Sequence, residues 1–293
     1  MRPSFNPPAY NFAFLDEGSK REIRRKSLKA VAIPGYQVPF ASRELPIGRG
    51  WGTGGLQLTL SLIGKEDVLK VIDQGNDDSV NAVSIRRLVE ETSGIRTTED
   101  TAEASVIQSR HRVPEEHLEE RQILVLQVPQ PEPLRKVEPR ERQSRRKHAE
   151  MDYSAMWLTL YEGIVKWGDI TLGADYPVMV HERYIMAPSP IPRWDNNKLH
   201  QADHLTLFGA GREKKIYAVP PYTNVLPLEF EDYRFKVESF EGKACRHCGS
   251  THTFLDEVTA EDGVCALYQC SDTAYCSKRQ QSRSGEKEVP SWQ

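Results

Sequence analysis

The cysteines are the residues whose type and spacing most directly indicate chemistry. Cys245 and Cys248 are separated by two residues and followed at once by Gly249. Two thiols on such a tight turn can point at one metal ion, in a zinc site or an iron–sulfur site. The later cysteines have wider spacing, so the common zinc pattern of two C-x2-C pairs is not met. All the cysteines of the chain lie in this one stretch: Cys245, Cys248, Cys265, Cys270 and Cys276.

Disulfides, a structural metal and redox chemistry are the three uses open to these thiols. The first residues carry early prolines and no long apolar block, so they do not resemble a secretory signal. We therefore expect a cytoplasmic protein with reduced thiols, and an odd number of cysteines also disfavours disulfides. The residues alone favour a structural zinc site, with an iron–sulfur site as the main alternative. His247 or His252 could replace a cysteine as ligand, although a solvated or hydrogen-bonded histidine is the preferred interpretation.

Composition describes a globular protein rather than a disordered one. Apolar residues make up 38% of the 293 residues and charged residues 28%, which is enough to bury a sizeable core. The formal charge of −3 gives no indication of a nucleic-acid partner. No apolar run approaches the roughly 20 residues that cross a bilayer, so no membrane partner is expected.

The segments that must position the thiols mix helices and strands. The pattern Ser19-x-x-Glu22 is typical of a helix N-terminus, and the helix it starts must end before Pro34. Residues 56–63 alternate apolar and polar side chains, which predicts a strand. Helices closed by glycine are expected at 66–74 and 78–93, and further strands at 104–110, 122–128, 176–186 and 214–220.

The second half of the chain reads in the same mixed way. Residues 128–148 are rich in proline and charge and predict a surface connector. Aromatic and aliphatic residues recur at helical spacing from Tyr153 to Trp167, as in a core helix or a partner-docking face. Without regular alternation of helix and strand, we expect an α+β main body with a small Cys-rich metal-binding module near the C-terminus. The expected parts are 1–128, a connector 129–150, a second α+β part 151–240, the module 241–276 and a disordered tail 277–293.

Two glycine-rich segments could bind an anionic ligand through backbone N–H groups. One carries Arg49 and Gly54, and residues 209–215 carry Arg212 and Lys214. Neither has the spacing of a nucleotide-binding fingerprint, and a plain turn is an equally good interpretation of each.

His111 is a further candidate for phosphate or metal binding. It lies between Arg110 and Arg112, whose positive charges oppose protonation of the ring. An ordinary surface histidine is the preferred interpretation.

Several long motifs together resemble one family, from about Tyr10 to Cys276. They read KAVAIPGYQVPF, GWGTGG, KVIDQGNDD with NAVSIR, QVPQPEPLR, PSPIP, FGAGREKKIYAVPP, and C-x2-C-x21-C followed by SDTAYC. In these motifs the chain resembles the catalytic subunit of the bacterial carbon–phosphorus lyases. Cys265 has no role in the family pattern, and we expect it to be a small buried hydrophobic residue.

The resemblance implies a radical S-adenosylmethionine enzyme. In it, Cys245, Cys248 and Cys270 would hold a [4Fe–4S] cluster, and one iron would be left open for S-adenosylmethionine. Gly35 matches the family's glycyl-radical position, and Cys276 matches the thiol that takes over the radical and attacks phosphorus. In aerobically prepared protein we expect either zinc or an empty site, and Cys276 would be the fourth ligand of a bound zinc.

The implied reaction is cleavage of the carbon–phosphorus bond of α-D-ribose 1-methylphosphonate 5-phosphate, giving methane and the ribose 1,2-cyclic phosphate. Implied partners are the sister subunits of a multi-subunit core complex and a docking ABC-type ATP-binding protein. Two other classes stay open: a zinc-ribbon scaffold that binds partners without chemistry and, less favoured, a nucleotide-binding protein. It is also open whether Gly35 and Cys276 meet without a movement of the protein.

Overall fold

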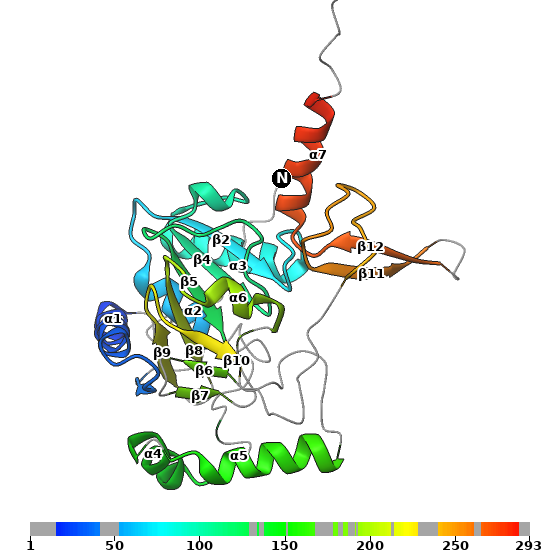
Figure 1. Cartoon of the computed structure of the whole chain (residues 1–293). Coiled ribbons are helices and arrows are strands. Elements are labelled where there is room, and N and C mark those ends of the chain that lie inside the picture. Colours follow the sequence, from blue (N-terminus) through cyan, green and yellow to red (C-terminus); the bar gives the residue numbers. More distant parts are fainter. Residues whose placement is uncertain are drawn as a thin grey trace, which may run out of the picture.

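The centre of the protein is a seven-stranded sheet with the order β1-β9-β8-β5-β4-β2-β3 (Figure 1). The strands from β8 to β3 run parallel, and β9 is antiparallel to both of its neighbours. The strands are β1 Val38–Pro39, β2 Val68–Asp73, β3 Arg96–Thr97, β4 Val106–Arg110, β5 Ile123–Gln127, β8 Leu205–Ala210 and β9 Lys215–Val219. The computed structural model describes residues 16–41, 53–128, 134, 138–150, 152–167, 178–180, 184–186, 191, 193–211, 214–227, 240–260 and 265–286.

Buried apolar side chains form a cluster on each face of this sheet. On one face, α1 (Glu17–Ala32), α2 (Thr53–Leu62) and α3 (Val80–Ser93) pack against the strands. The other face is covered by α6 and the small sheet β10-β6-β7. The central strands are thus buried on both sides, as parallel strands usually are. These covering elements are β6 Val178–Val180, β7 Tyr184–Met186, α6 Asn196–Leu199 and β10 Val225–Pro227, with short 3-10 turns at Thr101–Glu103 and Arg193–Asp195.

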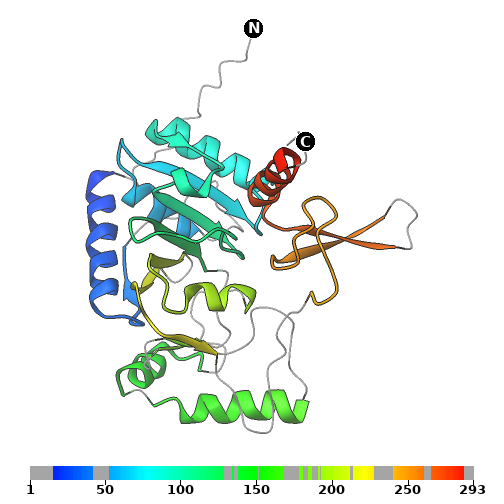
Figure 2. The same cartoon turned by 45° about the horizontal axis from the view of Figure 1, so that its top comes forward.

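The remaining elements lie outside this layered body. The helices α4 (Glu141–Glu150) and α5 (Ser154–Tyr161) follow β5, and a π-helical turn at Glu162–Lys166 extends α5. We define the cysteine module as residues 240–260 and 265–286. It contains the hairpin of β11 (Leu255–Thr259) and β12 (Ala266–Cys270) and the helix α7 (Thr273–Glu286). Both views place α1 and the module on opposite sides of the sheet (Figures 1 and 2). Within the described residues, no helix has the length and apolarity needed to cross a bilayer.

The expected mixed fold with a C-terminal cysteine cluster is confirmed, and most strands of its main sheet are parallel. The helix expected at 78–93 is α3, which Ser79 caps at its start and Gly94 ends with a φ of 72°. The helix expected from 153 to 167 is α5 with its π-helical turn. The strands expected at 104–110, 122–128 and 214–220 are β4, β5 and β9.

Two predictions were wrong because both segments are buried on all sides. The alternation of apolar and polar residues that marks a half-exposed helix or strand does not apply to them. Residues 56–63 lie mostly in α2 rather than in a strand, and the polar members of the alternation, such as Gln57 and Thr59, are themselves buried. Residues 66–74 were expected to be helical but contain β2. Its Lys70 is fully buried, and its charge is compensated by an ion pair with Asp77, which is later in the chain.

The bounds of several other elements differ from the predicted ones, because contacts outside the local sequence pattern set them. The N-cap of α1 is Asp16, whose carboxylate accepts the N–H of Ser19 at 2.7 Å. The run 176–186 contains two short antiparallel strands, β6 and β7. Part of the predicted connector forms α4, and residues 277–286 of the predicted disordered tail continue α7. The two α+β parts expected on either side of the connector share one sheet, since β8 pairs with β5.

Candidate metal centre

The turn after Cys245 gathers backbone N–H groups around that thiol. The N–H of Gly249 donates to the carbonyl of Cys245 at 2.8 Å, and Gly249 adopts a φ of 67° that favours glycine. The Cys245 sulfur accepts the N–H groups of Cys248 at 3.5 Å and Cys270 at 3.4 Å. Burial alone would raise the pKa of the Cys245 thiol, but these and one further N–H lower it to about 6. The turn is therefore built to hold a thiolate.

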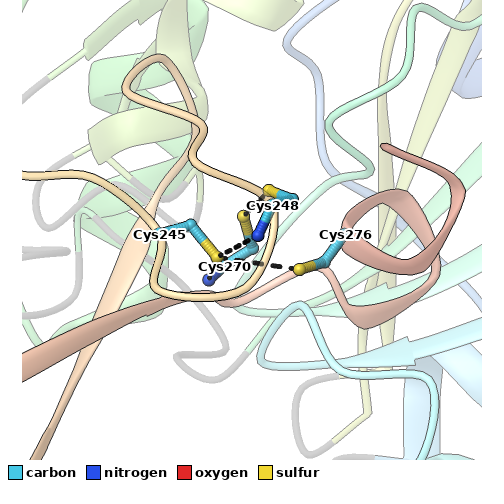
Figure 3. A group of neighbouring side chains, drawn as sticks. All are labelled: Cys245, Cys248, Cys270 and Cys276. Atoms are coloured by element: carbon cyan, nitrogen blue, oxygen red, sulfur yellow. Dashed lines mark hydrogen bonds between the residues drawn. The ribbon is translucent and has the colours of Figure 1, made fainter. Parts of the chain in front are cut away.

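Four buried thiols converge at this turn. All four sulfur atoms lie within 4.8 Å of one another, and they come from the turn, the end of β12 and the first turn of α7 (Figure 3). A zinc ion bonds sulfur at about 2.3 Å, which puts tetrahedral ligands about 3.8 Å apart. The Cys245–Cys276 sulfur distance of 3.7 Å and the Cys248–Cys270 distance of 3.5 Å match that spacing. The ligand set is Cys245, Cys248, Cys270 and Cys276.

The donor set fits a single tetrahedral ion more closely than a larger cluster. A four-iron cluster puts each thiolate on a different iron, which spreads the sulfurs farther apart than four ligands on one ion. Burial raises the pKa of Cys276 to about 11, although the amide of Gln280 at 3.5 Å opposes this. Burial also raises the pKa of Cys270 above its ordinary range. A bound cation would favour the deprotonated form of these two thiols, because metal ligands bind as thiolates.

Of the cysteines, only Cys265 lies outside this group. It is exposed, which corrects the expectation of a small buried hydrophobic residue. Neither candidate histidine joins the thiols. His247 is exposed and accepts a hydrogen bond from Arg246 at 3.0 Å, and His252 is also exposed. The preferred interpretation of both histidines is confirmed.

The module is bound where the main sheet reverses its order. After β2 the chain adds β3 on one side and then β4 on the other, and ligands of open α/β sheets bind at such a switch point, beyond the carboxyl ends of the strands. The Ser271 hydroxyl donates to the carbonyl of Gln74 after β2 at 2.7 Å. After β4, the Glu115 N–H donates to Asp272 at 2.9 Å. The module is therefore fastened at the carboxyl ends of β2 and β4, where a ligand of such a sheet is expected.

Positive side chains lie at the carboxyl end of β4, beside the module. Arg110 makes two hydrogen bonds with the buried Asp73, at 2.6 and 2.9 Å, and Arg112 stacks on Phe254 of the module with 3.2 Å between its guanidinium carbon and the ring centre. His111 between them is exposed and has a φ of 69°, which is unusual for a residue with a side chain. Loss of hydration lowers the pKa of His111, and the two arginines add to this. The ring is thus neutral at pH 7 and able to meet a metal or an anion.

Gly35 is not near the thiols. It is buried in the turn between α1 and the edge strand β1, with a φ of 76°. Four strands separate β1 from β2, beside which the module lies, and at about 4.8 Å per strand the separation is on the order of 20 Å. The structure therefore does not bring Gly35 and Cys276 together.

The two glycine-rich segments meet each other rather than the thiols. A β-carbon on Gly54 in α2 would lie 2.7 Å from the carbonyl carbon of Gly209 in β8, so this glycine allows the helix and the strand to pack backbone to backbone. Lys214 lies in the turn between β8 and β9, where its carbonyl accepts the N–H of Phe40 at 2.9 Å. Arg49 and Arg212 lie outside the described residues. Phosphate binding by these segments stays a prediction.

The sequence did not single out the charged residues that fasten the module. Asp77 belongs to the motif KVIDQGNDD, and Glu115 follows His111 by four residues. Their partners in the module, Thr273 for Asp77 and Phe254 for Glu115, lie far away in the chain. The only available signal was the clustering of carboxylates directly after a strand.

Comparison with known proteins matches almost the whole chain. The family model described as phosphonate metabolism protein PhnJ matches residues 8–282. A protein of Escherichia coli (strain K12) named alpha-D-ribose 1-methylphosphonate 5-phosphate C-P lyase is 56% identical over 279 residues, covering 95% of this chain and 98% of that protein. A protein of Rhizobium meliloti (strain 1021) with the same activity in its name is 56% identical over 270 residues, covering 92% and 91% of the two chains.

Proposed function

Because the chain belongs to the PhnJ family of phosphonate metabolism proteins, we propose that it is a C–P lyase acting on α-D-ribose 1-methylphosphonate 5-phosphate. The coverage of both relatives at 56% identity supports the same reaction class and substrate. The observation that carries the proposal is the position of Cys276. Its thiol converges with three other buried thiols, on a module that is fastened at the switch point of the sheet.

The products we propose are methane and the ribose 1,2-cyclic phosphate 5-phosphate. The bond between carbon and phosphorus breaks, and the ribose 2-hydroxyl forms a new bond to phosphorus. The hydrogen lost by that hydroxyl balances the hydrogen gained by the methyl group. Hydrolysis with loss of a methyl anion would require a far too basic leaving group, so we infer a homolytic reaction.

Radical chemistry of this kind requires a cofactor, and we propose that Cys245, Cys248 and Cys270 are its protein ligands. A [4Fe–4S] cluster with S-adenosylmethionine supplies radical chemistry to enzymes that bind them. Thiolates are suitable ligands for iron–sulfur clusters and for zinc alike. The described spacing of the four sulfurs fits zinc, so binding of the larger group requires the thiols to separate.

Cys276 is the residue that we propose attacks phosphorus. Its sulfur lies 3.7 Å from that of Cys245, in the position of a fourth ligand. A thiol cannot bind a metal permanently and also react with substrate, so Cys276 must leave this position during the reaction. It is the only one of the four that is supplied by a helix, which makes its separate movement possible.

Gly35 is the proposed source of the radical for Cys276. Its lack of a side chain and its positive φ suit a backbone radical delocalised over the neighbouring amide and carbonyl groups. The distance on the order of 20 Å across the sheet means that the proposal requires a conformation in which the two residues meet.

The substrate carries two anionic groups, and we propose that the loop after β4 contributes to binding them. Arg110, Arg112 and the neutral ring of His111 offer hydrogen-bond donors beside the module. The two arginines also hold Asp73 and Phe254, so they are already fixed in place.

Sister subunits are part of the proposal because α5 exposes apolar side chains. Leu158 in α5 is 60% exposed, and Trp167, directly after the π-helical turn, is 70% exposed; exposed apolar patches mark interaction surfaces. We propose that this helix contacts another polypeptide of a multi-subunit complex, such as an ATP-binding protein.

Methane formation tests the function. The protein is reconstituted with iron and sulfide without oxygen, in complex with its partner subunits, and is then given the ribosyl methylphosphonate, S-adenosylmethionine and a reductant. Methane is measured by gas chromatography. We expect methane from the native chain and from a Cys265→Ala control, whose thiol is exposed and outside the cluster.

A Cys276→Ala variant should form no methane but should still cleave S-adenosylmethionine. Methane from this variant would remove Cys276 from the mechanism. A colourless protein that binds only zinc and forms no methane under these conditions would support the alternative, a zinc-ribbon scaffold without chemistry.

A further inference from the structure

One face of α7 lies against the metal-binding turn. Cys276, Arg279, Gln280 and Arg283 follow the spacing that places helical side chains on one side. Gln280 donates to the Cys276 sulfur at 3.5 Å, and the pKa of Arg279 is raised mainly by Tyr275, to which the thiol of Cys248 adds. This face therefore carries one ligand and two positive charges. Zinc with four thiolates has a net charge of −2, which the two arginines offset.

Arg283 makes the most distant contact of this face. Its guanidinium donates from Nη1 to the carbonyl oxygen of Cys248, which is itself one of the four candidate ligands. Gly249 leaves the space for this contact, because a β-carbon there would overlap the guanidinium. Arg283 is seven residues from Cys276, which corresponds to about 10 Å along a helix. Because this contact is so far from Cys276 along the helix, it restricts the tilt of α7 relative to the metal-binding turn.

Tilt matters because α7 is attached to the hairpin by a short link. Cys270 ends β12, and only Ser271 and Asp272 separate it from the start of α7 at Thr273. The first turn is held by the Thr273 hydroxyl, which accepts the N–H of Asp77 at 3.2 Å. Rotation about this point would carry Cys276 away from the other three thiols, which belong to the turn and the hairpin.

We propose that Arg283 is a positioning residue that locks Cys276 into the fourth ligand position by clamping α7 onto the carbonyl of Cys248. Release of the clamp converts the site from four thiols to three, with Cys276 free and the other three unmoved. The inference concerns the ligand set of the module and does not depend on the lyase reaction.

Site-resolved alkylation tests the clamp in the full chain loaded with Zn²⁺ under reducing conditions. Iodoacetamide labelling of each cysteine is followed by mass spectrometry, and zinc release to a colorimetric chelator is followed in parallel. For Arg283→Ala we expect Cys276 to be labelled about tenfold faster and zinc to be lost about tenfold faster, as for other groups that orient metal ligands. Labelling of Cys245, Cys248 and Cys270 should initially stay at the native rate.

Matched variants separate the clamp from a general loosening of the module. Arg283→Lys, which keeps a donor on this face, should restore part of the protection, and Ser282→Ala, a change at an exposed neighbour on the same helix, should label like the native protein. Gly249→Asn tolerates the left-handed backbone but displaces the guanidinium, so it should also expose Cys276 selectively.

Two outcomes would overturn the inference. One is native labelling of Cys276 in both Arg283→Ala and Gly249→Asn. The other is an equal rise at all four cysteines, which would mean that Arg283 only stabilises the module as a whole. Methane formation has no part in this test. A failure of the clamp proposal can therefore be distinguished from a failure of the proposed function.

Discussion

The cysteine module and the seven-stranded sheet reach stability by different means. The sheet buries a large apolar cluster on each face. The module has one small cluster made of the four cysteines and Leu255, with Phe240 and Tyr268 packed against it. A core of that size requires a further source of free energy, and a bound metal is the source that four thiols offer. From this difference we expect the module to fold only when its metal ion is bound, whereas the sheet should fold without a metal ion.

The largest expected effect, loss of the folded structure of the whole module, follows from removing one of its ligands. Cys270→Ser replaces a thiolate at the end of β12, and we expect the affinity for zinc to fall by at least about 100-fold. Limited proteolysis should then cut the variant within residues 245–276 while the sheet stays protected. Cys265→Ser serves as control and should retain zinc. Native protease resistance of the module in metal-free Cys270→Ser would contradict the comparison.

A buried charge in the sheet gives the next largest effect. Lys70 and Asp77 form an ion pair at 2.9 Å with both side chains essentially inaccessible. Lys70→Met leaves the carboxylate without its partner, and we expect a loss of about 3–5 kcal/mol in the free energy of unfolding. Urea unfolding measures this loss. The control is Lys20→Met, which breaks an exposed pair with Glu17 and should cost less than about 1 kcal/mol.

If Lys70→Met cost no more than its control, the buried pair would not be part of the native sheet. The variant also tests how independent the two regions are. Asp77 donates its N–H to Thr273 at the start of α7, so some loss of zinc retention should accompany the loss of sheet stability.

Close packing of backbones gives a smaller effect that is confined to the sheet. In Gly54→Ala the new methyl group meets the backbone of Gly209 and Gly211, which cannot move aside cheaply. We expect a loss of about 2–3 kcal/mol despite the better helix propensity of alanine. Thermal unfolding measures it, with Gly64→Ala as control, since a β-carbon at Gly64 would have only an ordinary contact. Zinc retention should not change, and equal stability of the two variants would show that α2 packs less closely on β8.

Sequence predicted what local chemistry determines. The C-x2-C turn and the Gly94 end of α3 were visible because each depends on a few neighbouring residues. The grouping of Cys270 and Cys276 with that turn came from the family resemblance instead. The exposure of Cys265 was missed because burial is set by the whole fold.

The misread segments 56–63 and 66–74 both lie in the buried centre. There, polar side chains such as Thr59 and Lys70 are covered by elements distant in sequence, so a polar residue no longer marks an exposed face. The fastening of the module on the sheet was likewise invisible, since Glu115 and Asp272 meet across a long stretch of chain.

The smallest expected effect is a pH dependence that belongs to the sheet alone. His204, directly before β8, is 4% exposed, and burial lowers the pKa of its ring to about 4, with the nearby His117 adding to the shift. In the unfolded chain the ring takes up a proton near pH 6.5. Between these values the unfolded state binds more protons than the native state, so stability falls as the pH falls from 6.5 towards 4. At pH 5 the loss is about 2 kcal/mol.

His204→Met isolates this contribution, because it fills the buried position with an apolar side chain of adaptable shape that cannot be protonated. Urea unfolding of both proteins is measured at pH 7 and pH 5. Acid also weakens zinc binding by protonating the thiols, but this affects both proteins alike. The native protein should therefore lose about 2 kcal/mol more than the variant between the two pH values. An equal loss in both would mean that the His204 ring is protonated in the folded state, and acid sensitivity would then belong to the thiols and not to the sheet.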